Sequence, residues 1–168
     1  LPTVNSLLGD LMASGEVIKN GRAESQGGRK PDLYQLAGDA FYVLSVDINK
    51  FRVRAAIYNS SNECITEAET IKITLNNEKE TFEQICDFIL NHKNNSGIPD
   101  EKIIAIGISM PGLIDSIHGI NHTYLKFGKK SLVENFEARL ERRVFLETDA
   151  RAMTLAEFKF GQKDNYKK

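Results

Sequence analysis

The residues at the start of the chain that are best suited to chemistry are short polar side chains. Thr3, Asn5 and Ser6 lie at the beginning of a segment whose apolar residues recur with helical spacing. Hydroxyl and amide groups at this end of a helix can hydrogen-bond to base edges in the major groove of DNA. A glycine-rich stretch follows at residues 19–30, with four positive charges and one negative. It suits contacts with phosphates or with the minor groove, and its candidate contact residues are Arg22, Gly28, Arg29 and Lys30.

The elements that must position these groups are a helix and two strands. Pro2 suits a first helical turn, Gly15 suits the left-handed residue past the helix end, and strands are expected at 16–19 and 33–36. The helical stripe, expected to be one buried face, comprises Val4, Leu7, Leu8, Leu11 and Met12. Helix, strand, polar tip and strand is the order of a winged helix-turn-helix, so residues 1–38 are predicted to be the C-terminal part of such a domain. The chain begins at Leu1, inside this motif, so its first helices are expected upstream.

An ordinary surface hairpin is the alternative interpretation of the same segment. Residues 1–38 hold four basic and four acidic side chains, so the segment as a whole is neutral and only its tip is basic. Basic loops are common on protein surfaces, and charge by itself does not separate the two interpretations.

Composition limits the class of protein. The chain has 168 residues, 41% of them hydrophobic, and a net charge of −1, which excludes a globally basic nucleic-acid coat protein. No apolar run approaches the roughly 20 residues that span a membrane, and no signal peptide is visible, so a cytoplasmic protein without membrane contact is expected. Cys64 and Cys86 are isolated and are predicted to be buried thiols. His118 and His122 are four residues apart, but Gly119 between them favours a turn over a metal-binding helix.

From residue 39 the sequence alternates between strand and helix patterns. The expected elements are strands at 41–48, 52–58 and 64–73, a helix at 78–91, a strand at 102–109, a helix at 132–140, a strand at 143–146 and a helix at 150–160. The nearly continuous apolar run at 102–109 is typical of a buried parallel strand. Three meandering strands followed by alternating helices and strands predict an α/β unit with a mixed sheet.

Five sequence blocks, in their order and spacing, resemble a known family. They are Pro2-Thr3-Val4, Gly27-Gly28-Arg29-Lys30-Pro31, Val46-Asp47-Ile48, Gly-Ile-Ser-Met-Pro-Gly-Leu-Ile-Asp at 107–115 and Leu-Glu-Thr-Asp-Ala-Arg-Ala at 146–152. The chain resembles the ROK family (repressor, open reading frame, kinase), in particular its regulators of the xylose and N-acetylglucosamine repressor branch. The resemblance implies that residues 39–168 form the first lobe of an actin-like (ribonuclease H-like) ATPase fold that binds a sugar. It also implies that the second lobe is absent from this chain. The family's zinc motif belongs to that lobe, so no cofactor is expected in this chain.

One loop separates the family's kinases from its regulators. The kinases place Asp-x-Gly-Gly-Thr after the first strand, where glycine lets backbone N–H groups close around ATP phosphates. This chain has Asp47-Ile48-Asn49-Lys50-Phe51-Arg52 instead, without glycine or threonine. The resemblance therefore implies no ATP binding and no enzyme activity, and Asp47 is predicted to be a hydrogen-bonding residue at a strand end.

The family's sugar pocket maps onto Gly112, Thr148 and Asp149. The resemblance implies that the sugar approaches the Gly112 backbone and that Asp149 holds a sugar hydroxyl. From the residues alone, Pro111-Gly112 predicts a tight turn and Asp149 is expected to be a helix N-cap. Thr148 and Arg151 depart from the family, which has asparagine at both positions.

Together these patterns predict a DNA-binding transcriptional regulator of carbohydrate metabolism, most simply a repressor tuned by a sugar or sugar derivative. The expected partners are a double-stranded DNA operator, a sugar effector and further copies of the chain, because one short recognition helix gives limited affinity. The alternatives are a ROK-family sugar kinase and a regulator that no longer responds to ligand.

Overall fold

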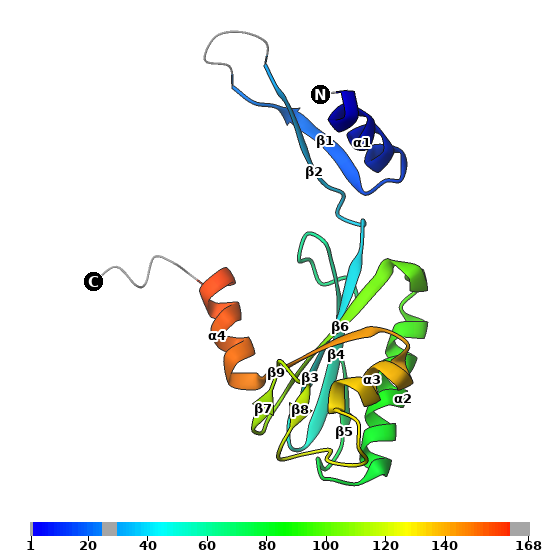
Figure 1. The fold of residues 1–168 in the computed structure, drawn as a ribbon, viewed down its shortest axis with the longest axis vertical. Coiled ribbons are helices and arrows are strands. Elements are labelled where there is room, and N and C mark those ends of the chain that lie inside the picture. The colour runs from blue at the N-terminus through cyan, green and yellow to red at the C-terminus, as the bar shows by residue number, and fades with distance from the viewer. Residues whose placement is uncertain (1, 25–29, 162–168) are drawn as a thin grey trace, which may run out of the picture.

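The computed structural model describes residues 2–24 and 30–161. In this part of the chain an N-terminal unit stands at one end of a larger α/β lobe (Figure 1). The N-terminal unit comprises α1 (Pro2–Ala13), β1 (Val17–Arg22) and β2 (Asp32–Leu36). The lobe comprises β3 (Tyr42–Ile48), β4 (Arg52–Asn59), β5 (Glu69–Lys72), α2 (Lys79–Asn95), η1 (Asp100–Lys102), β6 (Ile103–Met110), β7 (Ile114–Asp115), β8 (Ile120–Asn121), α3 (Leu132–Leu140), β9 (Arg143–Thr148) and α4 (Asp149–Phe160).

The N-terminal unit is a helix followed by an antiparallel hairpin, as the sequence predicts. Gly15 follows α1 with a φ of 78°, the left-handed conformation expected of it. The predicted burial of the helical stripe is wrong: α1 packs mainly against β1, and Val4 is 55% exposed and Leu7 57% exposed. Leu8 is the one member of the stripe that is half-buried.

The lobe is built on a five-stranded mixed sheet with the order β5-β4-β3-β6-β9. β3 pairs antiparallel with β4 and parallel with β6, and β6 pairs parallel with β9. The mixed sheet and the central parallel strand are thus confirmed. The third strand is shorter than predicted. Cys64 forms a single β-bridge to Tyr58, and the Ile57 N–H donates to the Thr66 hydroxyl at 3.0 Å, not to a backbone carbonyl.

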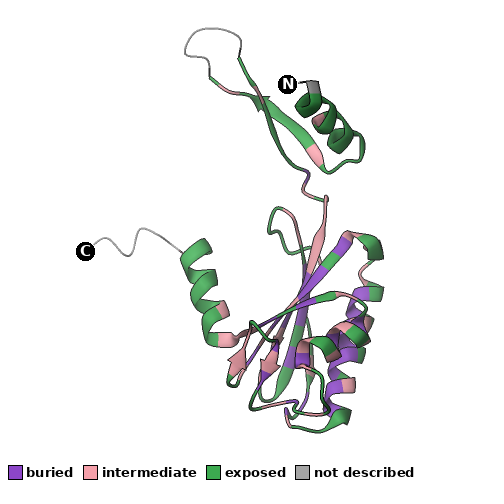
Figure 2. Ribbon diagram, in the orientation of Figure 1, coloured by how far each residue is buried: buried purple, intermediate pink, exposed green. Residues whose placement is uncertain are grey.

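One face of the sheet carries the core. α2 and α3 cover this face (Figure 1), and buried residues are concentrated on these helices and on the strands (Figure 2). Met110 is fully buried there, and so are the inward residues of β3 and β6, Leu44, Val46, Ile48, Ile106 and Ile108. In the described part of the chain the other face has no such cover: α4 extends from the end of β9, and none of its residues is buried. None of the helices among the described residues is long and apolar enough to cross a membrane.

The two cysteines differ, which corrects the expectation that both are buried. Cys86 lies inside α2, fully buried, and burial raises the pKa of its thiol to about 12. Cys64 is exposed, and its Sγ lies 3.3 Å from the Thr66 carbonyl oxygen. The pattern around Cys64 resembles a strand, but the chain leaves the sheet there.

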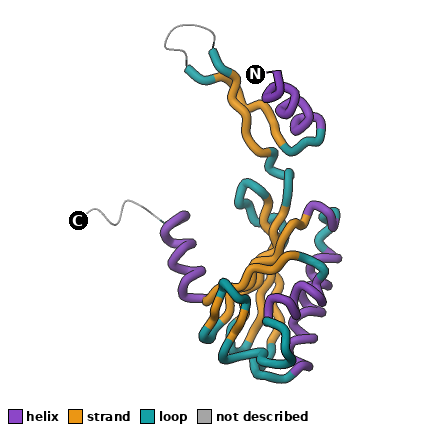
Figure 3. Tube along the Cα trace, viewed as in Figure 1, coloured by secondary structure: helices purple, strands orange, loops and turns teal. Residues whose placement is uncertain are grey.

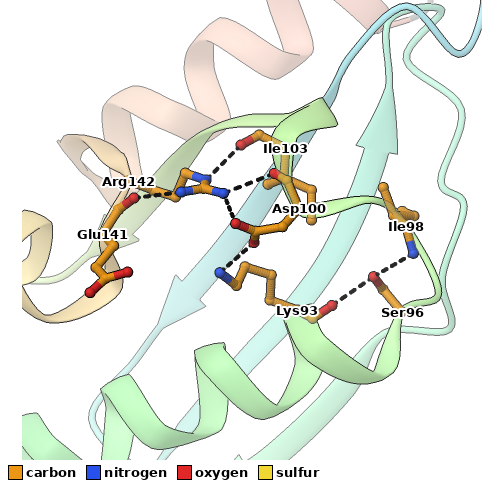
Figure 4. Close-up of polar contacts among 7 residues, drawn as sticks. All are labelled: Lys93, Ser96, Ile98, Asp100, Ile103, Glu141 and Arg142. Atoms are coloured by element: carbon orange, nitrogen blue, oxygen red, sulfur yellow. Dashed lines mark hydrogen bonds and ion pairs between the residues drawn. The ribbon is translucent and has the colours of Figure 1, made fainter.

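A network of ion pairs and hydrogen bonds lies at the end of the sheet where β6 begins (Figure 4). Lys93, near the end of α2, donates to Asp100 at 2.6 Å, and Arg142 pairs with the other oxygen of the same carboxylate. The Lys93 and Arg142 side chains are 10% and 20% exposed. Burial, and then the charge of Arg142, lower the pKa of the Lys93 ammonium. Asp100 is therefore the shared counter-charge of two poorly solvated cations.

Removing that carboxylate should destabilise the lobe. We expect Asp100→Ala to lower the free energy of unfolding by about 2 kcal/mol, because two partly buried cations lose their anion. Asp87→Ala is the matched control: Asp87 also pairs with an arginine, Arg139, but the two side chains are 59% and 38% exposed. Its expected cost is below about 0.5 kcal/mol. Urea unfolding of the two variants measures both, and equal costs would contradict the assigned role of Asp100.

Candidate functional site

The uncovered face of the sheet forms a cleft of about 1090 Å³. The three parallel strands line it, and α4, the residues around His118 and the first part of α3 form its sides. Because successive side chains of a strand point to opposite faces, alternate strand residues face the cleft. The strand residues that face the cleft are Ser45, Asp47, Gly107, Ser109, Arg143, Phe145 and Glu147. The lining carries five carboxylates and one arginine, so the cleft is acidic.

Two carboxylates of the cleft are held by neighbouring polar groups. Ser109 of β6 donates to Asp47 of β3 at 3.0 Å, which is the strand-end hydrogen bond predicted for Asp47. Glu147 of β9 accepts the Thr148 N–H at 2.8 Å, lies 3.3 Å from the Ser116 hydroxyl and pairs with Arg151 at 3.5 Å. Sequence reasoning did not select Glu147. The available clue was its position two residues before Asp149, since alternate residues at the end of a strand share a face.

Asp149 also lines the cleft, at the first turn of α4. The helix N-cap is Thr148, whose hydroxyl accepts the Arg151 N–H at 3.3 Å, so the expectation that Asp149 caps the helix is wrong by one residue. Asp149 Oδ1 accepts the N–H of Ala150 at 2.8 Å. Oδ2 has no partner among the described residues, and the half-buried side chain leaves it open to a ligand.

Gly112 lies in a bend directly after β6, where Pro111-Gly112 predicts a tight turn. Its φ is 119°, and a Cβ atom there would lie 2.6 Å from Oδ1 of Asn121. Asn121 is 2% exposed, donates to the Pro111 carbonyl at 3.0 Å and accepts the N–H groups of the residues at 123 and 124. Neither Gly112 nor Thr148 lies in the cleft lining, so the structure brings only Asp149 of the three predicted sugar contacts into it. The structural role of Asn121 was not recognised from sequence, where it reads as a turn residue.

The loop after β3 is held by hydrogen bonds to the side chain of one of its own residues, Asn49. Asn49 Oδ1 accepts the backbone N–H groups of Phe51 and Arg52, each at 2.9 Å, and the Asn49 N–H donates to the Arg52 carbonyl. Two N–H groups in the position of a phosphate cradle are thus already occupied. The loop lacks glycine and is also internally hydrogen-bonded.

The predicted DNA-contacting residues are distributed over α1 and the hairpin. Thr3, Asn5 and Ser6 are exposed on α1, and Lys30 is exposed where the description of the chain resumes. Gly28 and Arg29 lie outside the described residues.

The basic tip of the hairpin is partly neutralised. Arg22 donates to Asp32 at 3.1 Å, and Lys19 pairs with the same carboxylate at 2.8 Å. The hydrogen bond from Lys19 is the main cause that lowers the pKa of Asp32. Asp32 therefore offsets part of the positive charge counted over residues 19–30.

Of the two histidines, His118 lies in the turn between β7 and β8, and His122 directly follows β8, so the pair is not on a helix. His118 Nδ1 lies 2.7 Å from Asp115 Oδ2, and the hydrogen bond from His118 is the main cause that lowers the pKa of the Asp115 carboxyl. Within the described ranges, no three metal-ligating side chains are grouped in a way that could hold an ion.

The fold of the lobe is that of the actin-like sugar kinases and repressors. A family model described as "ROK family" matches residues 43–168, and the chain belongs to this family. A solved ROK family transcriptional regulator, a homologue of the Escherichia coli Mlc protein, superimposes with a TM-score of 0.70 at 20% identity, over 95% of this chain and 41% of that one. A ROK family glucokinase from Streptomyces griseus, solved with glucose and AMPPNP, gives a TM-score of 0.55 at 22% identity, over 72% of this chain and 37% of that one.

The curated relatives are named as repressors. The xylose repressor of Caldicellulosiruptor bescii is 27% identical over 164 residues, covering 95% of this chain and 41% of that protein. The xylose repressor of Bacillus subtilis is 24% identical over 168 residues, covering 98% of this chain and 43% of that protein. The repressor Mlc of Escherichia coli is 26% identical over 130 residues, covering 73% of this chain and 31% of that protein. The chain thus spans about two-fifths of the length of the xylose repressors it matches.

Proposed function

We propose that this chain is the DNA-binding and first-lobe part of a transcriptional repressor of carbohydrate-metabolism genes, with an operator affinity set by a sugar. The observation that carries the proposal is the extent of the similarity. The alignments with the two xylose repressors cover 95% and 98% of the chain and so include the N-terminal unit. The glucokinase superposition covers 72%, about the share that the family model matches.

The proposed DNA-binding domain is residues 1–38, the C-terminal part of a winged helix-turn-helix. In this proposal Thr3, Asn5 and Ser6 of α1 contact base edges, which supports sequence preference. The wing residues Arg22, Gly28, Arg29 and Lys30 contact phosphates or the minor groove. The apolar stripe of α1 remains exposed in this chain, as expected of a helix that packs on further helices of a DNA-binding domain.

The proposed effector site is the cleft over β3, β6 and β9 in the lobe at residues 39–168. Carboxylates are good acceptors for sugar hydroxyl groups, and Asp149 Oδ2 has no described partner. Gly112 and Thr148 are proposed contacts at the rim. The acidic lining favours a neutral polyhydroxyl ligand over a phosphorylated one, because like charges repel.

We infer that the protein is not an ATP-dependent kinase. Asn49 occupies N–H groups that a phosphate cradle would need, and five carboxylates in the cleft disfavour a polyanionic nucleotide. A regulator without ligand response is the second candidate, favoured by the Arg151–Glu147 pair, which occupies a cleft carboxylate. Operators are proposed to be pseudo-palindromic and bound by dimers, since repeated half-sites raise affinity.

Binding to DNA from its own promoter region tests the proposal. In the full-length gene product, Asn5→Ala should relax preference at one base pair, by a factor of about 5–150 for a contact of 1–3 kcal/mol. Lys30→Ala should weaken binding to all sequences and reduce the salt dependence by about one counterion. Lys72→Ala, an exposed lysine of β5 on the lobe, is the control and should change neither. Fluorescence anisotropy at two salt concentrations measures all three; unchanged binding in both test variants would rule out this DNA-binding face.

A further inference from the structure

The segment that joins the N-terminal unit to the lobe is hydrogen-bonded to the lobe. A single short loop, residues 37–41, connects β2 to β3 (Figure 3). Its first residue, Ala37, is 4% exposed and donates its N–H to the Glu16 carbonyl at 2.9 Å. The first residue of the loop is therefore hydrogen-bonded to the N-terminal unit.

A serine of the lobe holds the same loop from the other side. The Ser60 hydroxyl, in the turn after β4, lies 2.5 Å from the Ala37 carbonyl oxygen and 2.9 Å from that of Gly38. Its single hydrogen is shared between two acceptors on consecutive residues. Asn59 Oδ1 fixes the turn by accepting the Ser61 and Glu63 N–H groups, each at 2.9 Å.

A lysine provides a second, independent tie. Lys102 Nζ donates to the Asp39 carbonyl oxygen at 2.8 Å and lies 3.2 Å from the Asp39 carboxylate. Lys102 is the last residue of η1, directly before β6. Ser60 and Lys102, here called the latch, thus bind three successive linker residues from two separate loops of the lobe.

The strands next to the latch lead to the cleft. β3 begins directly after the linker and β6 directly after Lys102, and the two run parallel as neighbours. At their far ends, Ser109 of β6 donates to Asp47 of β3 inside the cleft. β3 and β6 thus connect the cleft at one end of the sheet with the latch at the other.

We propose that Ser60 and Lys102 fix the orientation of the N-terminal unit on the lobe and couple ligand binding in the cleft to that orientation. An unattached linker would leave the hairpin free to rotate, and a ligand in the cleft would then have no differential contact with its orientations. The coupling half of the proposal rests on the proposed function. The orientation half does not.

Distance measurement tests the orientation half. Spin labels on Asp10→Cys in α1 and Glu80→Cys in α2, in a Cys64→Ser background, report the distance between unit and lobe; the buried Cys86 is left in place. We expect a narrow distance distribution in the labelled parent and a clearly broader one after Ser60→Ala with Lys102→Met. The control variant is Ser61→Ala with Lys72→Met, the same two substitutions at residues whose side chains have no described hydrogen bond to the linker. It should leave the distribution narrow. A broad distribution in the parent, or a narrow one in the latch variant, would overturn the proposal.

Operator binding with and without effector tests the coupling half in the full-length protein. Effector-dependent changes in affinity are typically about 5–150-fold. In the latch variant we expect this ratio to fall to within about twofold of one, with sugar affinity in the absence of DNA unchanged. A ratio equal to that of the parent would refute the coupling. Absence of both sugar and DNA binding in the parent would instead refute the proposed function, and the distance measurement would still decide the orientation.

Discussion

Replacing Gly112 with alanine is expected to lower the free energy of unfolding by about 3 kcal/mol. The φ of 119° is open to glycine and strained for any residue with a Cβ atom. The added Cβ would also lie 2.6 Å from Oδ1 of Asn121, which is buried and hydrogen-bonded on several sides and so has little room to withdraw. Strain and collision act together at this turn. Thermal or urea unfolding measures the loss.

Gly107→Ala is the matched control for this prediction. Gly107 lies in β6, its φ is not positive, and a Cβ there would have no atom within 4 Å. Its expected change is within about 0.5 kcal/mol, as for an uncrowded strand position. Adding Asn121→Ala to both Gly112 forms separates the two causes, because the collision disappears and the backbone strain remains. Equal stabilities of the Gly107 and Gly112 variants would show that the turn does not need glycine.

The lobe could be predicted from sequence because its pattern is strong at every level. The apolar run at β6 predicts an internal strand of a sheet. The helical stripe predicts the buried face of α2, which comprises Phe82, Ile85, Cys86 and Ile89. These positions are buried because neighbouring elements of the same lobe cover them. Where no neighbouring element among the described residues covers a position, periodicity predicted burial wrongly, as for Leu7 of α1 and for the exposed Cys64.

Side-chain contacts between distant segments were less accessible to sequence reasoning. Asn121 and Gly112 meet across a short hairpin, and Ser60 reaches the linker over 23 residues of chain. Neither contact follows a sequence spacing from which it could be predicted. The helix cap shows a smaller error of the same kind: Thr148 and Asp149 are both good caps, and the register that selects Thr148 is fixed by where β9 ends.

The position of that cap sharpens the prediction for the effector site. We expect Asp149→Ala to weaken sugar affinity at least tenfold in the full-length protein, because a charge-assisted hydrogen bond contributes about 1.5–3 kcal/mol. Since Thr148 is the cap, the variant keeps the cap and loses the hydrogen bond from the Ala150 N–H together with the favourable interaction of a carboxylate with the helix N-terminus, in all about 0.5 kcal/mol of stability at this exposed helix end. Affinity and stability are thus separable at this residue. Calorimetric titration with a panel of neutral sugars and sugar phosphates measures the affinity.

Two further variants make the test decisive. Asp149→Asn loses the same charge but can keep the hydrogen bond from the Ala150 N–H, so it should cost less stability than Asp149→Ala. Its amide oxygen also still accepts a hydroxyl, so its affinity should lie between those of the parent and Asp149→Ala. Thr148→Ala should show the reverse, a loss of about 1 kcal/mol of stability with a smaller effect on affinity, because its hydroxyl is engaged by the Arg151 N–H. The acidic cleft predicts that neutral sugars bind and phosphorylated ones do not. Unchanged affinity in Asp149→Ala would remove this carboxylate from the site, whereas a parent protein that binds none of the panel would favour a regulator that does not respond to sugar.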